Sequence, residues 1–219
     1  MTTKLLVTVY TTLTALLMSG CAGKVRYPNY YTLAVAPTKK PVLNEAHQSA
    51  TVAVRRFDTP AYLRQGRIVY RETPEEVGFY DYHRWASDPG AVVTTGVIDA
   101  LRSASLFSVV EPYAGQEHPD YLLSGRLERL DEVDSNGSVL VEVRLSAELV
   151  NVRTGESIWA GTVSETSTAS ARNVNSVVVA MGHAAQSGID QLVANIEKQL
   201  SDTSVATAIC GTTAEISRK

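Results

Sequence analysis

The feature that most constrains the fold is the stretch Val139–Leu149, in which apolar and polar side chains alternate almost without interruption. Successive side chains of a strand point to opposite faces, so this pattern is typical of a strand with one buried face in an antiparallel sheet. Asp134–Gly137 before it and Asn151–Gly155 after it have the composition of turns. We therefore predict a three-stranded antiparallel meander of residues 120–132, 139–149 and 156–165. Its middle strand would bury Val139, Val141, Val143, Leu145, Ala147 and Leu149.

Two segments have the period of amphipathic helices. Ser87 or Asp88 can cap the first, and Pro89 suits its first position. The apolar stripe of the first helix is Val93, Val97, Ala100, Leu101 and Ala104. The second helix is predicted from Val174 to Leu200, and its stripe is Val174, Val177, Val178, Met181, Ala185, Ile189, Leu192, Val193, Ile196 and Leu200.

The remaining segments complete an α+β fold, a mostly antiparallel sheet with two helices packed on one face. The length suits one domain, which we place at residues 30–200. Residues 201–219 are small and polar without periodicity, so we expect a flexible C-terminal tail. The shorter strands are predicted at Tyr30–Leu33, Thr51–Phe57, Arg67–Arg71, Val77–Tyr82 and Leu106–Glu111.

Residues 1–20 have the pattern of a cleaved signal peptide. Lys4 is the only charged residue before Lys24, and Leu5–Leu17 is apolar apart from its threonines and one tyrosine. As a helix this run would measure roughly 20 Å, which is shorter than the ~30 Å hydrocarbon core of a bilayer. We therefore predict a segment that directs export and is then removed.

The end of that segment, Leu17–Cys21, resembles a bacterial lipobox, in which a cysteine receives a diacylglyceryl group and becomes the acylated amino terminus. The alternative is an ordinary signal with a chance cysteine. Several acyl chains hold a protein stably at a membrane, so residues 21–29 would be a lipidated tether. Ala22 resembles an outer-membrane address, which favours the periplasmic face of the outer membrane and leaves the inner membrane as the alternative. Cys210 would then be a free thiol or form an intermolecular bridge.

The sequence contains no familiar catalytic or metal-binding signature. The formal net charge is −3, with 20 basic and 23 acidic residues dispersed along the chain, which argues against nucleic-acid binding. There is no G-x-S-x-G, H-E-x-x-H or C-x-x-C motif, and the four histidines lie far apart. We expect no catalytic residue, no metal and no cofactor beyond the covalent lipid on Cys21. A hydrolase would have to use Asp81, His83 and Ser87; we interpret Asp81 and His83 instead as the rim of an aromatic cluster.

That cluster is the stretch Glu76–Gly90, "EVGFYDYHRWASDPG". Its rings fall on both sides of a short strand, as in a strand with one face in the core and one on a surface. Tyrosine, tryptophan and arginine also supply much of the binding energy of protein interfaces. Packing of residues 79–85 in the core and display on a partner surface both stay open. The residues of such a surface would be Tyr62, Arg64, Tyr80, Tyr82 and Arg84.

The lipobox and four further stretches together resemble the ABC-type transport auxiliary lipoproteins, which include the lipoprotein of the paraquat-inducible system. The stretches are "YYTL" from Tyr30, "VAVRRFDTPAYLRQGRIVYR" from Val52, "HRWASDPG" from His83 and "DYLLSGRLERLDEV" from Asp120. The insert "RETPEEVGFYDY" before Arg84 departs from the family pattern, so we expect its contacts to be specific to a subgroup.

The resemblance implies a non-catalytic component that works with a mammalian cell entry (MCE) protein and an ABC permease and ATPase. Such systems move lipids or other hydrophobic compounds across the bacterial envelope, and self-association of the lipoprotein is left open. Two alternative functions remain open. One is another envelope scaffold, which activates a cell-wall synthase or belongs to a secretion pore, and the other is a carrier that binds lipid itself.

Overall fold

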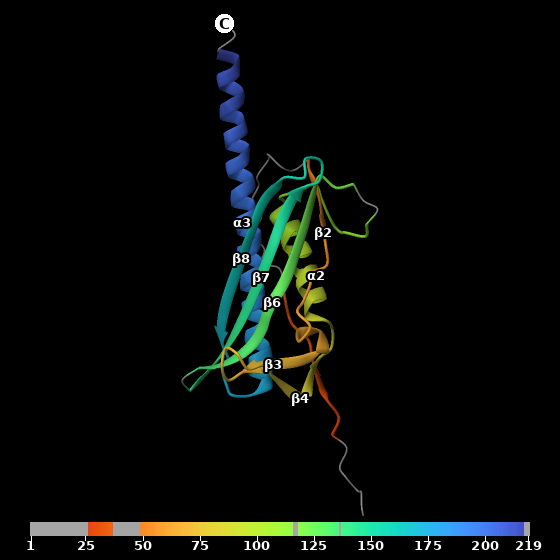
Figure 1. The fold of residues 1–219 in the computed structure, drawn as a ribbon, viewed down its shortest axis with the longest axis vertical. Helices are drawn as coiled ribbons and strands as arrows, with labels where there is room; N and C mark the ends of the chain where they lie inside the picture. The colour runs from red at the N-terminus through yellow and green to blue at the C-terminus, as the bar shows by residue number, and fades with distance from the viewer. Residues whose placement is uncertain (1–25, 37–48, 116–117, 136, 217–219) are drawn as a thin grey trace, which may run out of the picture.

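The computed structural model describes residues 26–36, 49–115, 118–135 and 137–216. They form the predicted α+β fold, an open, mostly antiparallel sheet of 8 strands with two helices (Figure 1). Cys21 and the expected signal peptide lie outside the described residues, so those expectations and the domain limits stay predictions.

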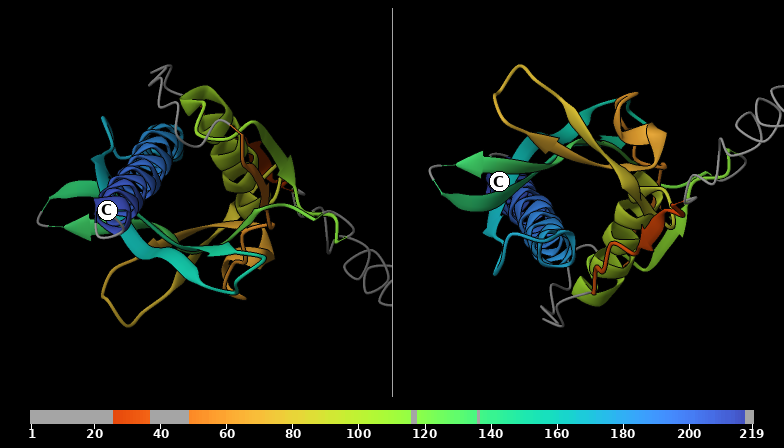
Figure 2. Two further views of the ribbon diagram at one scale, coloured as in Figure 1. Left: turned by 90° about the horizontal axis from the view of Figure 1, so that it is seen from above. Right: turned by 90° about the horizontal axis from the view of Figure 1, so that it is seen from below.

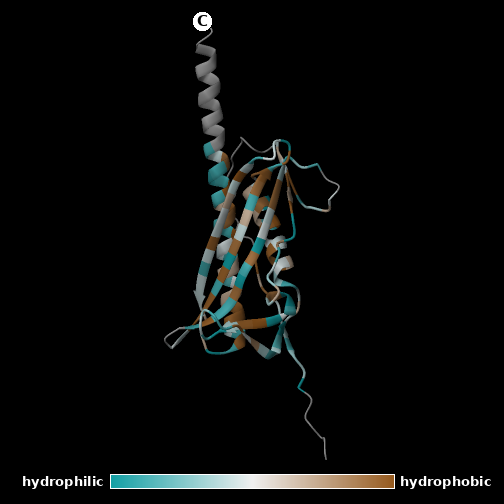
Figure 3. Cartoon of the chain, viewed as in Figure 1, coloured by the Kyte–Doolittle hydropathy of each residue, from teal (hydrophilic) through white to brown (hydrophobic). Residues whose placement is uncertain are grey.

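The predicted meander is confirmed and forms the largest part of the sheet. Its strands are β6 (Tyr121–Ser135), β7 (Ser138–Asn151) and β8 (Ser157–Thr168), and both pairings are antiparallel. All six alternate residues predicted to be buried in β7 are buried. Hydrophobic and hydrophilic residues are interspersed along these long strands in Figure 3. Local alternation therefore decided which face of the meander meets the core.

The second edge of β6 is shared by two short strands that pair with it in parallel. β2 (Thr51–Val54) lies beside the beginning of β6, and β3 (Arg67–Arg71) lies beside its end. The sequence pattern did not predict these parallel pairings, because alternation shows which face of a strand is buried but not which strand lies next to it. Three strands continue outward: β5 (Val109–Pro112) pairs with β2, β4 (Gly78–Trp85) with β3, and β1 (Asn29–Tyr31) with β4.

Both helices, α2 (Pro89–Ala104) and α3 (Val174–Ile216), lie on the same side of the curved sheet (Figure 2). The whole predicted stripe of α2 is buried, and so is that of α3 apart from the half-buried Val174. Asp88 is the N-cap of α2, and its Oδ1 accepts a hydrogen bond of 2.9 Å from the amide of Ala91. Of the two capping residues predicted from the sequence, Ser87 and Asp88, the helix uses Asp88.

The helix α3 differs from its prediction at the C-terminal end. We predicted that it would end at Leu200 and be followed by a flexible tail, whereas it continues to Ile216. Once a helix is nucleated, each added residue gains a backbone hydrogen bond, and there is no proline between Ser201 and Ile216 to stop it. At about 1.5 Å per residue α3 is roughly 65 Å long, so its end projects beyond the sheet (Figure 1). Among the described residues, no helix combines the length and apolarity needed to cross a bilayer.

Candidate binding site

A pocket of about 460 Å³ lies where the β3–β4 hairpin meets the end of β6. Three aromatic side chains, Tyr70, Phe79 and Tyr80, contribute to its wall. Glu132 from β6 also lines it. Asp134, near the end of β6, and Arg172, in the segment between β8 and α3, line it as well. The strands β3 and β4, which carry much of the pocket lining, lie at the same end of the molecule as the segment that leads into β1 (Figure 1).

Glu132 is the buried acid of this pocket. Only 9% of the residue is exposed, and the Tyr80 hydroxyl donates a 2.8 Å hydrogen bond to its Oε2. Burial raises the pKa of Glu132 above the usual value of a glutamate, and the hydrogen bond from Tyr80 partly opposes this rise. Burial and the bond to Glu132 raise the pKa of Tyr80 as well, so the phenol is neutral at physiological pH.

The aromatic wall depends on a glycine of β4. The rings of Tyr70 and Tyr80 have centroids 5.1 Å apart and are tilted by 59°, an arrangement that aromatic pairs favour. Tyr70 lies directly over Gly78, where an added Cβ would come within 2.3 Å of a ring atom. The missing side chain at Gly78 therefore makes the position of the Tyr70 ring possible.

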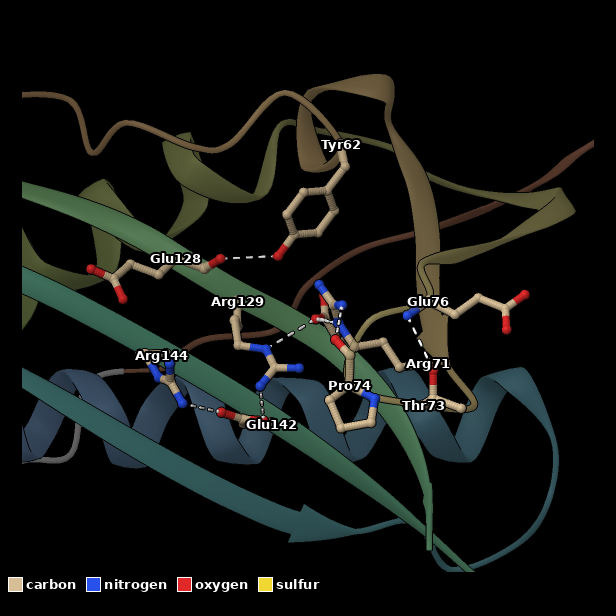
Figure 4. A network of polar contacts seen from close by, with 10 residues as sticks. Tyr62, Arg71, Thr73, Pro74, Glu76, Glu128, Arg129, Glu142 and Arg144 are labelled. Atoms are coloured by element: carbon tan, nitrogen blue, oxygen red, sulfur yellow. Dashed lines mark hydrogen bonds and ion pairs between the residues drawn. The ribbon is translucent and has the colours of Figure 1, made fainter.

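A cluster of polar contacts lies on the sheet (Figure 4) and shares Arg71 with the pocket lining. Its centre is Asp131, which is fully buried and whose Oδ2 lies 2.5 Å from Nε of Arg71 and 3.3 Å from Nε of Arg129. Glu142 of β7 accepts hydrogen bonds from Arg129 at 2.6 Å and from Arg144 at 2.8 Å. Chains of charge-assisted bonds of this kind hold strands in register, and here they tie β3, β6 and β7 together.

The predicted partner residue Tyr62 belongs to this cluster. Its hydroxyl donates a 2.9 Å hydrogen bond to the Glu128 carbonyl, and the Arg71 guanidinium lies 5.6 Å from the centre of its ring. Burial raises the pKa of Tyr62, and the nearby Asp131 carboxylate adds to the rise. Tyr62 therefore covers the buried charges of the sheet with its ring.

The other four predicted partner residues belong to two elements, the 3-10 turn η2 (Leu63–Gln65) and the strand β4. Arg64 lies in η2 and forms an exposed ion pair of 3.5 Å with Asp58. Tyr80 lines the pocket, and Tyr82 is 42% exposed, with the Arg26 guanidinium 5.5 Å from its ring centre. The fifth, Arg84, is half-buried. Within the described ranges, no hydrogen bond, ion pair or ring contact joins any two of the five, so their role in partner binding stays a prediction.

The stretch 79–85 divides between core and surface residue by residue. Trp85 is buried, Phe79 and Tyr80 are half-buried and pack against the core, and Tyr82 is exposed. His83 contacts the Tyr31 hydroxyl through Nδ1 at 2.8 Å, and Asp81 approaches Arg67 at 3.9 Å. The contacts of these two residues are thus with other partners, which argues against their use in a triad with Ser87. Among the described residues, no group of three or more histidine, cysteine or acidic side chains is placed to hold a metal.

Sequence analysis missed Glu132, Tyr70 and the Arg71–Asp131 pair. One signal was present in the sequence, since Leu130 and Glu132 are two residues apart and share a face of their strand. An acid at a core-facing position is unusual unless it has a partner or a function. The partners themselves could not be found this way, because 60 positions separate Arg71 from Asp131.

Comparison with solved structures supports the fold. The structure is similar to protein XCC0632 from Xanthomonas campestris, of the family DUF330, with a TM-score of 0.68 and 20% identity over 80% of this chain and 99% of that one. It is also similar to protein CT253 from Chlamydia trachomatis, with a TM-score of 0.50 and 9% identity over 69% and 98% of the two chains. At these identities the likeness concerns the fold alone.

Sequence comparison supplies the family. No curated protein matches the chain. The sequence model described as the ABC-type transport auxiliary lipoprotein component matches residues 31–208, which include every strand from β2 to β8, the whole of α2 and α3 as far as residue 208. The match confirms the resemblance found in the sequence, and the chain belongs to the family of ABC-type transport auxiliary lipoprotein components.

Proposed function

We propose that this lipoprotein is a docking component of an MCE-type ABC transport system that moves lipids or other hydrophobic compounds across the envelope. The observation that carries the proposal is the family match over residues 31–208, and the resemblance of Leu17–Cys21 to a lipobox supports it. The protein would hold the transport complex at a membrane and would have no catalytic step of its own. A shielded path matters for such cargo, because exposed apolar surface costs roughly 25 cal/mol per Å² in water.

The arrangement of the two ends of the chain supports a docking role. The N-terminal segment leaves the domain beside β1, and α3 projects from the opposite end (Figure 1). A lipid on Cys21 would be joined to β1 by residues 21–28, which extend at most about 30 Å. The domain would therefore stay close to the membrane, and α3 would reach away from it. Tethering raises the local concentration of a partner site, so modest contacts suffice for assembly.

The anchor in this proposal is a diacylglyceryl group with an added acyl chain on Cys21, at the periplasmic face of the outer membrane. We expect palmitate label to enter the native chain, and Cys21→Ser to lose the label and the attachment to membranes. Equal membrane attachment of the two proteins would contradict the anchor.

The partners are tested by purification of the full-length lipoprotein from detergent-solubilised envelopes. We expect an MCE protein, a permease and an ATPase to accompany it. Recovery of a cell-wall synthase or of a secretion pore in their place would refute the proposal and favour another envelope scaffold. Alanine at the exposed residues Tyr82 and Arg64 tests the predicted partner surface, and Arg153 in the β7–β8 turn is an exposed control position far from both in sequence.

A further inference from the structure

The pocket beside the β3–β4 hairpin has a charge that its own residues leave uncompensated. Four carboxylates line it, those of Glu72, Asp81, Glu132 and Asp134, against the two guanidinium groups of Arg71 and Arg172. Arg71 is committed to the buried Asp131, and Arg172 donates hydrogen bonds of 3.1 and 3.2 Å to the two oxygens of Asp134. The charge that remains is therefore negative.

Glu132 brings this charge into the pocket. The residue is more than nine-tenths buried, and the hydroxyl of Tyr80 donates a hydrogen bond to its Oε2. Among the described residues, Oε1 accepts no hydrogen bond, and Arg172 makes its bonds to Asp134 instead. Burial of most of the side chain makes the carboxylate costly to keep charged. Oε1 is not among the fully buried side-chain atoms that lack a hydrogen-bond partner, so it stays accessible from the pocket and is the natural contact of an incoming donor.

The walls specify which donor fits. The rings of Tyr70, Phe79 and Tyr80 line the same pocket as the acid. The faces of such rings attract cations, as the Arg67 guanidinium 5.9 Å from the Phe79 ring centre illustrates. An aromatic wall around one carboxylate suits an ammonium or guanidinium group on an apolar stem. A phosphate-bearing headgroup fits poorly, because both arginines of the pocket are already paired with acids and the net charge of its lining residues is negative.

We propose that this pocket binds a lysine or arginine side chain of a partner protein, with the cation at Oε1 of Glu132 and its stem against the rings of Tyr70, Phe79 and Tyr80. The inference rests on the proposed docking function and names the chemistry of one contact. The partner would present the basic side chain on an exposed loop or terminus, because the pocket opens at the end of the domain. Charge complementarity selects this occupant over a lipid headgroup.

The first experiment measures binding to the purified full-length lipoprotein in detergent by NMR titration of its aromatic resonances. The probes are the blocked tripeptides acetyl-Gly-Lys-Gly-amide and acetyl-Gly-Arg-Gly-amide, with acetyl-Gly-Glu-Gly-amide as the acidic control. We expect the basic peptides to shift the resonances of Tyr70, Phe79 and Tyr80, and the acidic peptide to leave them unchanged. Equal effects of the three peptides, or no effect of the basic ones, would overturn the inference.

Substitutions separate the pocket from general surface charge. Glu132→Gln keeps the shape of the side chain and an acceptor for Tyr80. We expect it to weaken the binding of the basic peptides by about tenfold, because a charge-assisted hydrogen bond is lost. Glu72→Gln removes the same charge from the exposed rim, and we expect a change below about threefold, because solvent screens exposed charges. Circular dichroism establishes that both variants are folded. Equal weakening by the two variants would refute a specific site at Glu132.

The last comparison keeps this inference distinct from the proposed function. Purification of Glu132→Gln from envelopes should lose the partner that native protein retains, whatever the identity of that partner. Retention of an MCE complex by Glu132→Gln at the native level would refute the pocket as a docking contact and leave the transport function intact. Binding to phosphatidylethanolamine vesicles that depends on Glu132, without binding of the basic peptides, would overturn the choice of a protein partner.

Discussion

Removal of the Asp131 carboxylate is the most informative test of how the sheet is held together. Asp131 is fully buried, and its partners Arg71 and Arg129 have side chains only 11% and 22% exposed. Removing one partner of a buried ion pair typically costs about 3–5 kcal/mol, because the remaining charge is left without compensation. Arg71 would keep its 2.9 Å bond to the Pro74 carbonyl, and Arg129 would keep Glu142. We therefore expect Asp131→Ala to lower the free energy of unfolding by about 3 kcal/mol, at the lower end of that range.

The assay is urea unfolding followed by circular dichroism, in which the midpoint and slope yield the free energy of unfolding. Arg64→Ala is the matched control, since its 3.5 Å pair with Asp58 has both side chains more than half exposed. Exposed pairs contribute at most about 1 kcal/mol, so we expect a small change. A loss below about 1 kcal/mol for Asp131→Ala, equal to that of the control, would refute the reasoning.

A paired substitution tests whether the cost comes from the orphaned charge. Arg71→Met with Asp131→Leu removes both charges and fills the space with apolar groups. Such replacements are often neutral or stabilising, so we expect the double variant to be more stable than Asp131→Ala alone. A double variant as unstable as the single one would mean that packing, and not the uncompensated arginine, sets the loss.

Three further substitutions probe single features. Ser105 ends α2 in the left-handed region at φ 54°, so Ser105→Gly should raise the free energy of unfolding by about 1 kcal/mol in the same urea assay. An added Cβ at Gly125 would lie 2.4 Å from the Phe57 ring. Gly125→Ala should therefore overpack the core, lower the free energy of unfolding by about 1–3 kcal/mol and so lower the melting temperature. The pKa of Glu132 is raised by burial, with Tyr80, Asp134 and Arg172 facing it, so folding carries a cost that Glu132→Gln should remove at pH 7. That gain should shrink as pH falls through the raised pKa and vanish below the value of an unfolded glutamate, and a gain independent of pH would contradict it.

Predictions from the sequence were correct where a pattern repeats over many residues. The stripe from Val177 to Leu200 and the alternation of β7 repeat many times, and their buried faces were predicted correctly. The end of α3 was missed, because an apolar stripe shows where a helix packs and not where its backbone ends. Of the five residues predicted for a partner surface, Tyr80 lies in the pocket and Tyr62 covers the polar cluster. Residue type alone does not show whether an aromatic ring is available to a partner or packs over groups of its own chain.

The sequence by itself determined the local structure of this protein, because alternation, helical stripes and the Asp88 cap depend on residues close together in the chain. Only the tertiary structure decided that β2 and β3 share one edge of β6, and therefore which side chains meet there. The Tyr80–Glu132 contact joins residues 52 positions apart. Such a contact depends on strand order and on the bulge in β6 between Leu127 and Arg129, which changes the face that later residues occupy. The candidate pocket is thus a product of pairing between distant segments, and no short stretch of the sequence contains it.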